Sequence, residues 1–177
     1  MSNTASRTLP DLRRMYEEYF AYVWKLVQRF GVPTRHIEDV VHDVFVVVHR
    51  HLAEFDTSKP LKPWLAAIAF RCASDFMRRA PQRREVPSSD SMEEPTTLMN
   101  PEASASAKQS HALVHKAVAR IDESRRPVFI LHEFENTPIP EIAAALSIPV
   151  NTAYSRLRLA REDFGNAVRA LTTGGAV

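Results

Sequence analysis

Residues 139–162, IPEIAAALSIPVNTAYSRLRLARE, decide the fold of this chain. Their apolar residues recur at intervals of three and four, which predicts a short helix from about Ile139 to Leu146, a brief turn, and a long helix from about Val150 onward. Ala143 is small where two helices must cross closely. Ile148 fills the turn, and Pro149 favours the start of the next helix. This composition predicts a helix-turn-helix, a motif that sends its second helix into the DNA major groove.

A helical wheel divides the second helix into two faces. We expect the inner face to hold Val150, Ala153, Leu157, Ala160 and Phe164, with Tyr154 at its margin. We expect the outer face to hold Asn151, Ser155, Arg158, Leu159 and Glu162, flanked by Thr152 and Arg156. Asn pairs well with adenine, Arg with guanine, and Ser or Thr with phosphates. An amphipathic helix with a solvated basic face is the alternative, but it does not explain the preceding short helix and the Ile-Pro turn.

The rest of the chain is also predicted to be helical. Glycine is scarce, hairpin signals such as Asn-Gly are absent, and apolar residues recur at helical spacing. We expect three N-terminal helices, over about 10–30, 34–54 and 62–80, that close a core by themselves. Thr8 is the expected cap of the first helix, and Gly31 its expected stop. Two further helices, one from about Ser110 and one after Ser124, precede the helix-turn-helix.

The segment between these two blocks is rich in Pro, Ser, Thr and acidic residues. Such a composition buries too little apolar surface to offset its ordering entropy, so residues 81–109 are expected to form a flexible linker. The predicted organisation is therefore all-α, with one helical domain over 9–80 and another over 110–172.

Composition limits the classes of function. The net charge is only +2, but the chain is basic over 71–84, acidic over 85–107 and basic again over 154–169, which suits two phosphate-binding surfaces. The one cysteine, Cys72, excludes an intramolecular disulfide and a cysteine metal cluster, and its spacing suits core packing. The N-terminus lacks the apolar region of a signal peptide, and the longest apolar run spans only 44–48. We expect a soluble, cytoplasmic protein without cofactor or metal.

Two blocks of sequence, together with their order and the acidic linker, resemble extracytoplasmic-function (ECF) sigma factors over about residues 9–171. DESRRPVFILHEFENTPIPEIAAALSIPVNTAYSRLRLARE, residues 122–162, is similar to their C-terminal domain. Residues 15–52 together with PWLAAIAFRCASDFMRR, residues 63–79, resemble their N-terminal domain. The resemblance implies a dissociable, non-enzymatic subunit of bacterial RNA polymerase. Its N-terminal domain would bind the polymerase clamp and the −10 element, and its C-terminal domain the flap and the −35 element. An anti-sigma factor is implied by analogy.

The resemblance also implies site residues. The clamp-binding positions are Asp39, His42, Asp43 and Val46, which share the outer face of their helix on the wheel. The −10 positions are Lys59, Lys62, Arg71, Arg78 and Arg79, with the loop 56–62 capturing an unstacked base. The −35 positions are Thr152, Tyr154, Ser155, Arg156 and Arg158, to which the wheel adds Asn151. Trp64 could stack a base, but core packing is favoured for it.

The chain departs from the usual pattern of the family at five positions. They are His42 where Gln is usual, Arg71 where Asn is frequent, Pro138 for a capping Ser, Ser147 for a turn Gly, and Leu159 where Arg is common. The departure at position 71 affects the −10 base preference, and the one at 159 removes one expected DNA contact.

Two other classes of function are alternatives to the sigma factor. A stand-alone helix-turn-helix regulator explains the C-terminal block equally well, but not the row of acids and Val46 near residue 40. A helical metal hydrolase using His42, Asp43 and His49 lacks the paired ligand spacings that such sites use. The acidic linker either occupies the RNA exit path of the polymerase or serves only as a tether, and its composition does not decide between the two.

Overall fold

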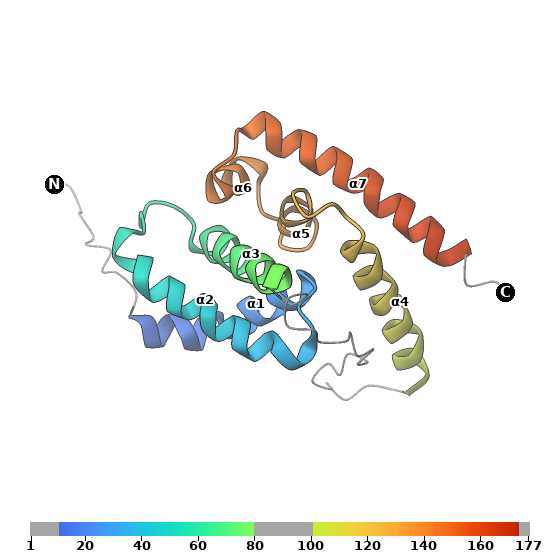
Figure 1. The fold of residues 1–177 in the computed structure, drawn as a ribbon, viewed down its shortest axis with the longest axis horizontal. Helices are drawn as coiled ribbons and strands as arrows, with labels where there is room; N and C mark the ends of the chain where they lie inside the picture. The colour runs from blue at the N-terminus through green and yellow to red at the C-terminus, as the bar shows by residue number, and fades with distance from the viewer. Residues whose placement is uncertain (1–10, 80–100, 174–177) are drawn as a thin grey trace.

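The computed structural model describes residues 11–79 and 101–173, and within these ranges it contains helices and turns but no strand (Figure 1). The elements are α1 (Leu12–Arg29), η1 (Thr34–His36), α2 (Ile37–His51), η2 (Leu52–Glu54), α3 (Leu61–Arg79), α4 (Pro101–Ala119), α5 (Arg126–Glu133), α6 (Ile139–Leu146) and α7 (Val150–Thr173). The all-α prediction is confirmed.

Helix bounds match the sequence prediction closely, with one difference. α6 has the predicted bounds and α7 begins at the predicted residue, whereas the helix expected from about Ser110 begins at Pro101. Part of the expected linker is therefore helical, because Pro101 and the Ala- and Ser-containing residues after it are compatible with a first helical turn and its continuation. The expected cap Thr8, the rest of the linker and its expected role lie outside the described residues.

The N-terminal helices pack on one another around a buried aliphatic core. α1, α2 and α3 contact each other pairwise. Val23, Leu26 and Val27 of α1 are fully buried, as are Val44 and Val48 of α2. The β-branched run in α2 is thus tolerated as a helix, because its side chains fill the core at three- and four-residue spacing.

α1 ends in a turn that needs a left-handed residue. Gly31 has φ +94°, its N–H bonds to the carbonyl of Gln28, and the N–H of Val32 bonds to the carbonyl of Val27. This is the Schellman arrangement, in which glycine is preferred because it adopts positive φ without steric cost. The predicted stop at Gly31 is confirmed.

In the C-terminal block, the long helix α7 is the element against which the other helices pack. α4, α5 and α6 all pack against it. The rings of Phe129 in α5 and Phe164 in α7 lie 5.0 Å apart, and Arg125 pairs with Asp163 at 2.9 Å beside them. These contacts fix α7 relative to the helices that precede it.

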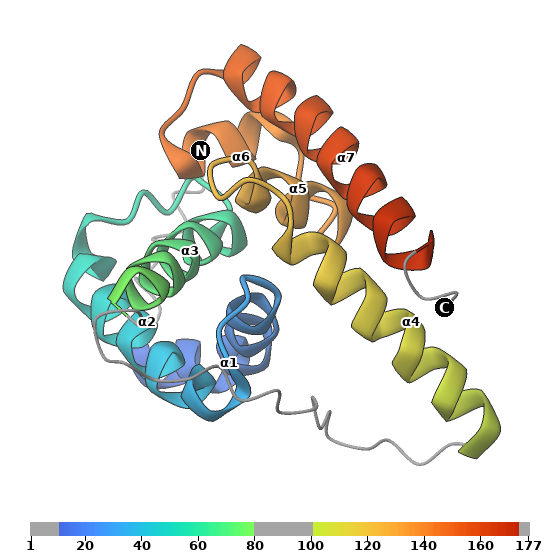
Figure 2. The same ribbon diagram turned by 45° about the vertical axis from the view of Figure 1, so that its right-hand side comes forward.

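The two blocks share one continuous core. α3 packs against α5 and α6 as well as against α1 and α2 (Figure 2). Pro63 and Ala67 are buried, although on a helical wheel they lie opposite Leu65 and Cys72, so α3 is covered on two opposite sides. The expected self-contained N-terminal core is therefore extended by the C-terminal helices.

Candidate nucleic-acid interface

The turn between α6 and α7 sets the direction of the second helix of the motif. Ser147 is left-handed (φ 56°, ψ 44°), its N–H bonds to the carbonyl of Ala144, and the N–H of Ile148 bonds to the carbonyl of Ala143 at 2.9 Å. This again is a Schellman ending, here with serine at the position that favours glycine. Ile148 is half-buried against the core, as its predicted role in the turn requires.

Small residues allow α6 and α7 to lie close together. Ala143 of α6 and Ala153 and Ala160 of α7 are each 1% exposed or less. Leu157 and the half-buried Phe164 complete the inner face. Val150 is an exception, because it is 41% exposed where the wheel placed it inward. As the first residue of α7 it lies a full turn before Ala153, beyond the part of the helix that the core covers.

The outer face of α7 is accessible. Asn151, Tyr154, Ser155 and Arg158 are exposed, while Thr152, Arg156 and Leu159 are half-buried. Tyr154 is 55% exposed, which makes it the most exposed of the large apolar side chains found at the surface of the described residues. All of the predicted −35 residues therefore lie on one helix with their side chains at least partly accessible to a ligand.

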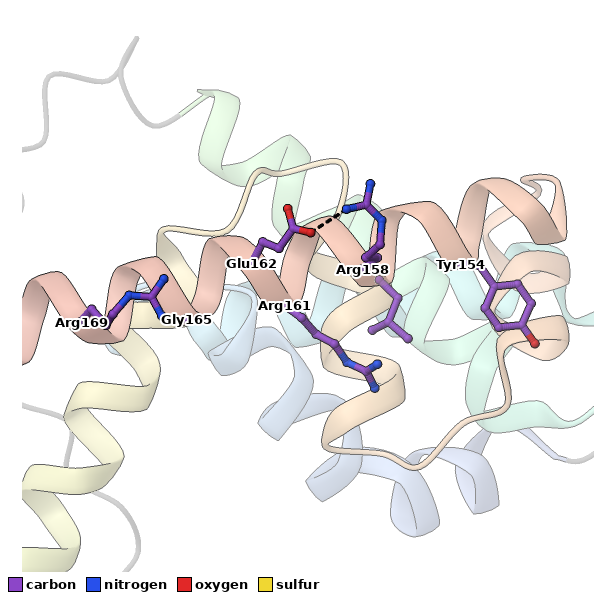
Figure 3. Close-up of a pocket in the computed structure, with 7 residues that line it drawn as sticks. Tyr154, Arg158, Arg161, Glu162, Gly165 and Arg169 are labelled. Atoms are coloured by element: carbon purple, nitrogen blue, oxygen red, sulfur yellow. Dashed lines mark hydrogen bonds and ion pairs between the residues drawn. The ribbon is translucent and has the colours of Figure 1, made fainter.

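A groove of about 560 Å³ runs along α7 from Tyr154 to Arg169 (Figure 3). Arg158 pairs with Glu162 at 2.6 Å, and Arg161 reaches across to Glu133 of α5 at 2.7 Å. Gly165 has no side chain, and a Cβ at this position would lie 3.6 Å from the guanidinium of Arg169. Sequence reasoning had not selected Arg161 or Arg169, although they continue a stripe of side chains at helical spacing.

A second, smaller cavity of about 390 Å³ lies between α2 and α3. It is lined by Val47, His51, Glu54, Trp64, Ile68, Arg71, Cys72 and Asp75. Among the predicted −10 residues, only Arg71 lines this cavity. Arg78 pairs with Asp75 at its edge. Arg79 is exposed at the end of α3.

The loop that precedes α3 is held by a local turn. Both the N–H and the hydroxyl of Ser58 donate hydrogen bonds to a carboxylate oxygen of Asp56, at 3.0 and 2.7 Å. These bonds lower the pKa of Asp56, because they stabilise its charged form. Lys59 and Lys62 are exposed, the former 3.8 Å from Asp56 and the latter over the ring of Tyr22.

Trp64 and Cys72 form the apolar side of the α2–α3 cavity. Trp64 is half-buried with its ring 4.7 Å from that of Phe55, so it is neither a fully buried core residue nor a freely accessible one. Burial raises the pKa of the Cys72 thiol to about 11, with further increases from the carboxylates of Asp43 and Asp75. The thiol is therefore protonated at neutral pH.

The predicted clamp-binding residues lie together on the outside of α2. Asp39, His42 and Asp43 are exposed, and Val46 is half-buried. Their neighbours Val44 and Val48 face inward and are fully buried, so the wheel had separated the two faces of α2 correctly.

The described residues hold neither a metal cluster nor a membrane-spanning helix. In residues 11–79 and 101–173, no group of three or more His, Cys, Asp or Glu side chains is arranged to hold a metal ion. In the same ranges, no helix is both long and apolar enough to cross a bilayer.

Comparisons with known proteins match both halves of the chain. Residues 15–84 match sigma-70 region 2, and residues 111–164 match sigma-70 region 4. The chain is 31% identical over 159 residues to the ECF RNA polymerase sigma-E factor of Escherichia coli (strain K12), which covers 84% of this chain and 82% of that protein. It is 30% identical over 135 residues to the RNA polymerase sigma factor NccH of Alcaligenes xylosoxydans xylosoxydans, covering 75% and 73% of the two chains.

Two solved structures share the fold. One is CnrH in complex with the cytosolic domain of CnrY (TM-score 0.65, 23% identity, 90% of this chain and 88% of that one). The other is the sigma factor RpoE of Bartonella quintana in complex with the anti-sigma factor NepR (TM-score 0.68, 18% identity, 90% and 97%). With region 2 and region 4 in order and relatives aligned along most of its length, the chain belongs to the ECF subfamily of the sigma-70 family of RNA polymerase sigma factors.

Proposed function

We propose that this chain binds core RNA polymerase and directs it to promoters by recognising a −35 element through α7 and a −10 element through α3 and the loop before it. The observation that carries the proposal is the accessible polar face of α7, presented by a helix-turn-helix. A solvated basic face would not require the close α6–α7 crossing through alanines that positions this helix.

Recognition of the −35 element would use the first three turns of α7. Asn151 can make two hydrogen bonds to adenine, and Arg156 or Arg158 can do so to guanine or contact phosphates. Arg158 would exchange its exposed partner Glu162 for DNA, which costs little because exposed ion pairs contribute less than about 1 kcal/mol. Leu159 is half-buried and offers an apolar contact in place of a charged one.

Recognition of the −10 element would use the cavity between α2 and α3. An unstacked base needs an apolar wall and a few polar groups at its edges. Trp64 and Ile68 supply the wall, and Arg71 and Glu54 supply a donor and an acceptor. The exposed Lys59 and Lys62 lie in and beside the adjoining loop, where they would contact the phosphates of the strand.

Binding to the polymerase clamp would use the outer face of α2. Asp39 and Asp43 offer negative charge and His42 offers a polar contact, with Val46 as a partly accessible apolar residue among them. Such a mixture is typical of a protein interface, where a central apolar contact is surrounded by charges that set orientation. By analogy with the relatives, the flap would bind the C-terminal helices, and an anti-sigma factor would bind the free protein. One of the similar structures is a complex with an anti-sigma factor.

Transcription in vitro tests the proposal. Duplexes that the protein binds best are selected from a random library, and promoters carrying them are transcribed by core polymerase with and without the protein. We expect start sites that depend on the protein. If the holoenzyme opens none of the selected promoters, the proposal fails, and a stand-alone regulator becomes the better interpretation.

A matched pair of variants tests the clamp surface within the same assay. Asp43→Lys reverses a charge inside the proposed docking face, and Glu18→Lys makes the same change on α1, outside it; both side chains are exposed. We expect Asp43→Lys to weaken core binding at least about tenfold, as unfavourable charge juxtaposition does at interfaces. Glu18→Lys should bind like the unmodified protein, and equal losses would remove the α2 face from the proposal.

A further inference from the structure

The cavity between α2 and α3 presents a donor and an acceptor at different ends of one apolar wall. Trp64, Ile68 and Arg71 are spaced by four and three residues, so they lie on one face of α3. Arg71 is about 10 Å along the helix axis from Trp64. Glu54 lies at the Trp64 end of the cavity, because the ring of the next residue, Phe55, is 4.7 Å from that of Trp64. A flat ligand on this wall therefore meets Arg71 at one edge and Glu54 at another.

The guanidinium of Arg71 is available to a ligand. The two carboxylates that line the cavity already have partners, because Glu54 pairs with His51 at 3.0 Å and Asp75 pairs with Arg78. Among the described residues, no carboxylate pairs with Arg71. A guanidinium carries five N–H groups in a planar fork, which matches two adjacent acceptor atoms. Arg71 is therefore able to bind a planar ligand through two parallel hydrogen bonds.

The size and the wall of the cavity suit a single nucleobase. Its volume of about 390 Å³ lies within the range of about 300–1,000 Å³ that small-molecule sites occupy. Trp64 is half-buried and Ile68 is 5% exposed, so the wall is apolar and held in place. Bases stack on aromatic side chains through their flat faces. A purine presents more ring surface to Trp64 than a pyrimidine does, which favours a purine.

The two polar ends of the cavity select guanine among the bases. Guanine has two adjacent acceptors, O6 and N7, which match the fork of Arg71. Its Watson–Crick edge carries N–H groups at N1 and N2, which match a carboxylate such as that of Glu54 and are accessible once the base is unpaired. Adenine has an amino group beside N7, which opposes a guanidinium. Cytosine offers a carboxylate only one amino group and is a smaller stacking surface, and thymine has no adjacent pair of acceptors.

We infer that the base captured between α2 and α3 is guanine, with Arg71 on its O6 and N7 atoms, Glu54 on its N1 and N2 groups, and Trp64 against its face. This inference rests on the proposed function and names the base that the −10 surface reads. It also gives a consequence to the departure at position 71. Asparagine, frequent there in the family, carries one donor group and one acceptor, whereas arginine only donates.

Titration of the full-length protein with single strands tests the inference without polymerase. Trp24→Phe leaves Trp64 as the one tryptophan, so its fluorescence reports a base stacked in the cavity. The probes are thymidine oligonucleotides with a central guanine, adenine or cytosine, or with thymine alone, at low salt. We expect the guanine strand to bind about tenfold more tightly than the other three, because one good bidentate contact discriminates by roughly 5- to 150-fold.

Variants of Arg71 show whether this side chain carries the preference. Arg71→Asn should bind the four strands with similar affinity, and Arg71→Lys should also lose most of the preference, because it keeps the charge without the fork. Arg79→Asn is the matched control: it lies on the same helix, is exposed and does not line the cavity, so it should weaken all four strands alike. Equal affinities in the unmodified protein, a preference for another base, or a guanine preference that persists in Arg71→Asn would overturn the inference. Circular dichroism verifies that each variant folds.

Modified bases assign the contacts to atoms. 7-Deazaguanine lacks the N7 acceptor, so it should bind the unmodified protein more weakly than guanine does but bind Arg71→Asn equally well. Inosine lacks the N2 amino group, so its loss of affinity should appear in the unmodified protein and disappear in Glu54→Ala. Losses that are the same in each variant as in the unmodified protein would place both atoms away from these side chains and overturn the assignment.

Promoter opening separates this inference from the proposed function. Each position of the −10 element is varied in the selected promoters, and opening by the holoenzyme is compared for the unmodified protein and Arg71→Asn. We expect one position of the non-template strand at which guanine is favoured about tenfold, and only by the unmodified protein. If promoters open without such a position, the inference fails and the proposed function stands. If single strands show the guanine preference that depends on Arg71 but no promoter opens, the base site stands and the proposed function fails.

Discussion

Replacing Ser147 by Gly should stabilise the helix-turn-helix. Ser147 occupies the left-handed position of the Schellman turn that ends α6, with φ 56°. Gly31 occupies the equivalent position at the end of α1, with φ 94°. The same backbone arrangement is thus closed by two different residues, and only glycine adopts it without steric cost.

The expected magnitude is the difference of two opposing terms. An L-residue in the left-handed region costs about 1–2 kcal/mol. Glycine removes that cost but loses more conformational freedom on folding, which costs about 0.5–1 kcal/mol. Ser147→Gly should therefore raise the free energy of unfolding by about 0.5–1 kcal/mol. For a chain of 177 residues with one continuous core, this corresponds to roughly 1–4 °C in Tm.

Urea denaturation followed by far-ultraviolet circular dichroism measures the effect. Tryptophan fluorescence adds a separate view of the N-terminal block, because Trp24 lies in α1 and Trp64 in α3. We expect a higher midpoint in the helical signal with an unchanged slope. Asn136→Gly is the control: Asn136 has φ 51°, but asparagine tolerates this region better than serine, so its gain should be smaller. A lower midpoint for Ser147→Gly would refute the reasoning from backbone strain.

Three further predictions concern single side chains. The pKa of Cys72 in the folded protein is about 11 against an ordinary 9.0, so iodoacetamide at pH 8 should modify it about 100-fold more slowly than an unhindered thiol. The stability linked to this shift is complete below pH 9 and declines as the pH rises through 11. Rapid alkylation of the folded protein would contradict the prediction. Asp163→Ala leaves Arg125 of the α5–α7 contact without its partner, so the urea midpoint should fall by the equivalent of about 1 kcal/mol, and an unchanged midpoint would show that the pair contributes nothing. Arg156→Ala should weaken duplex binding and, where Arg156 contacts a phosphate, reduce the slope of log affinity against log salt by about one. Arg169→Ala, near the far end of the same helix, should change neither the affinity nor this slope. Equal effects of the two variants would place the interface elsewhere on α7.

The spacing of residues along the sequence determined much of the fold. The bounds of α6 and the start of α7 follow from the spacing of Ile142, Ala143 and Leu146 and from the turn at Ile148. The separation of α2 into an inner valine face and an outer acidic face follows from periodicity in the same way. Such features depend on neighbours in the sequence, which is why a helical wheel predicts them.

Other features depended on contacts between distant residues. Val150 belongs to the inner stripe of α7 by spacing, but the core covers α7 only from Ala153 onward, about one turn later. The start of α4 at Pro101 was not predicted, because the residues before Ser110 have a composition typical of a linker. Arg71 was selected for its charge, whereas its place beside Trp64 and Glu54 in one cavity follows only from the packing of α2 on α3.

The sequence by itself determined an all-helical chain with a helix-turn-helix, because helix periodicity and turn chemistry are local properties. Only the tertiary structure decided that α3 carries a second buried face and that Arg29 of α1 meets Glu135 after α5. The physical reason is that alanines and a proline on the outside of α3 have no periodic signature of their own. The burial of α3 on several sides follows only from the packing of α1, α2, α5 and α6 around it.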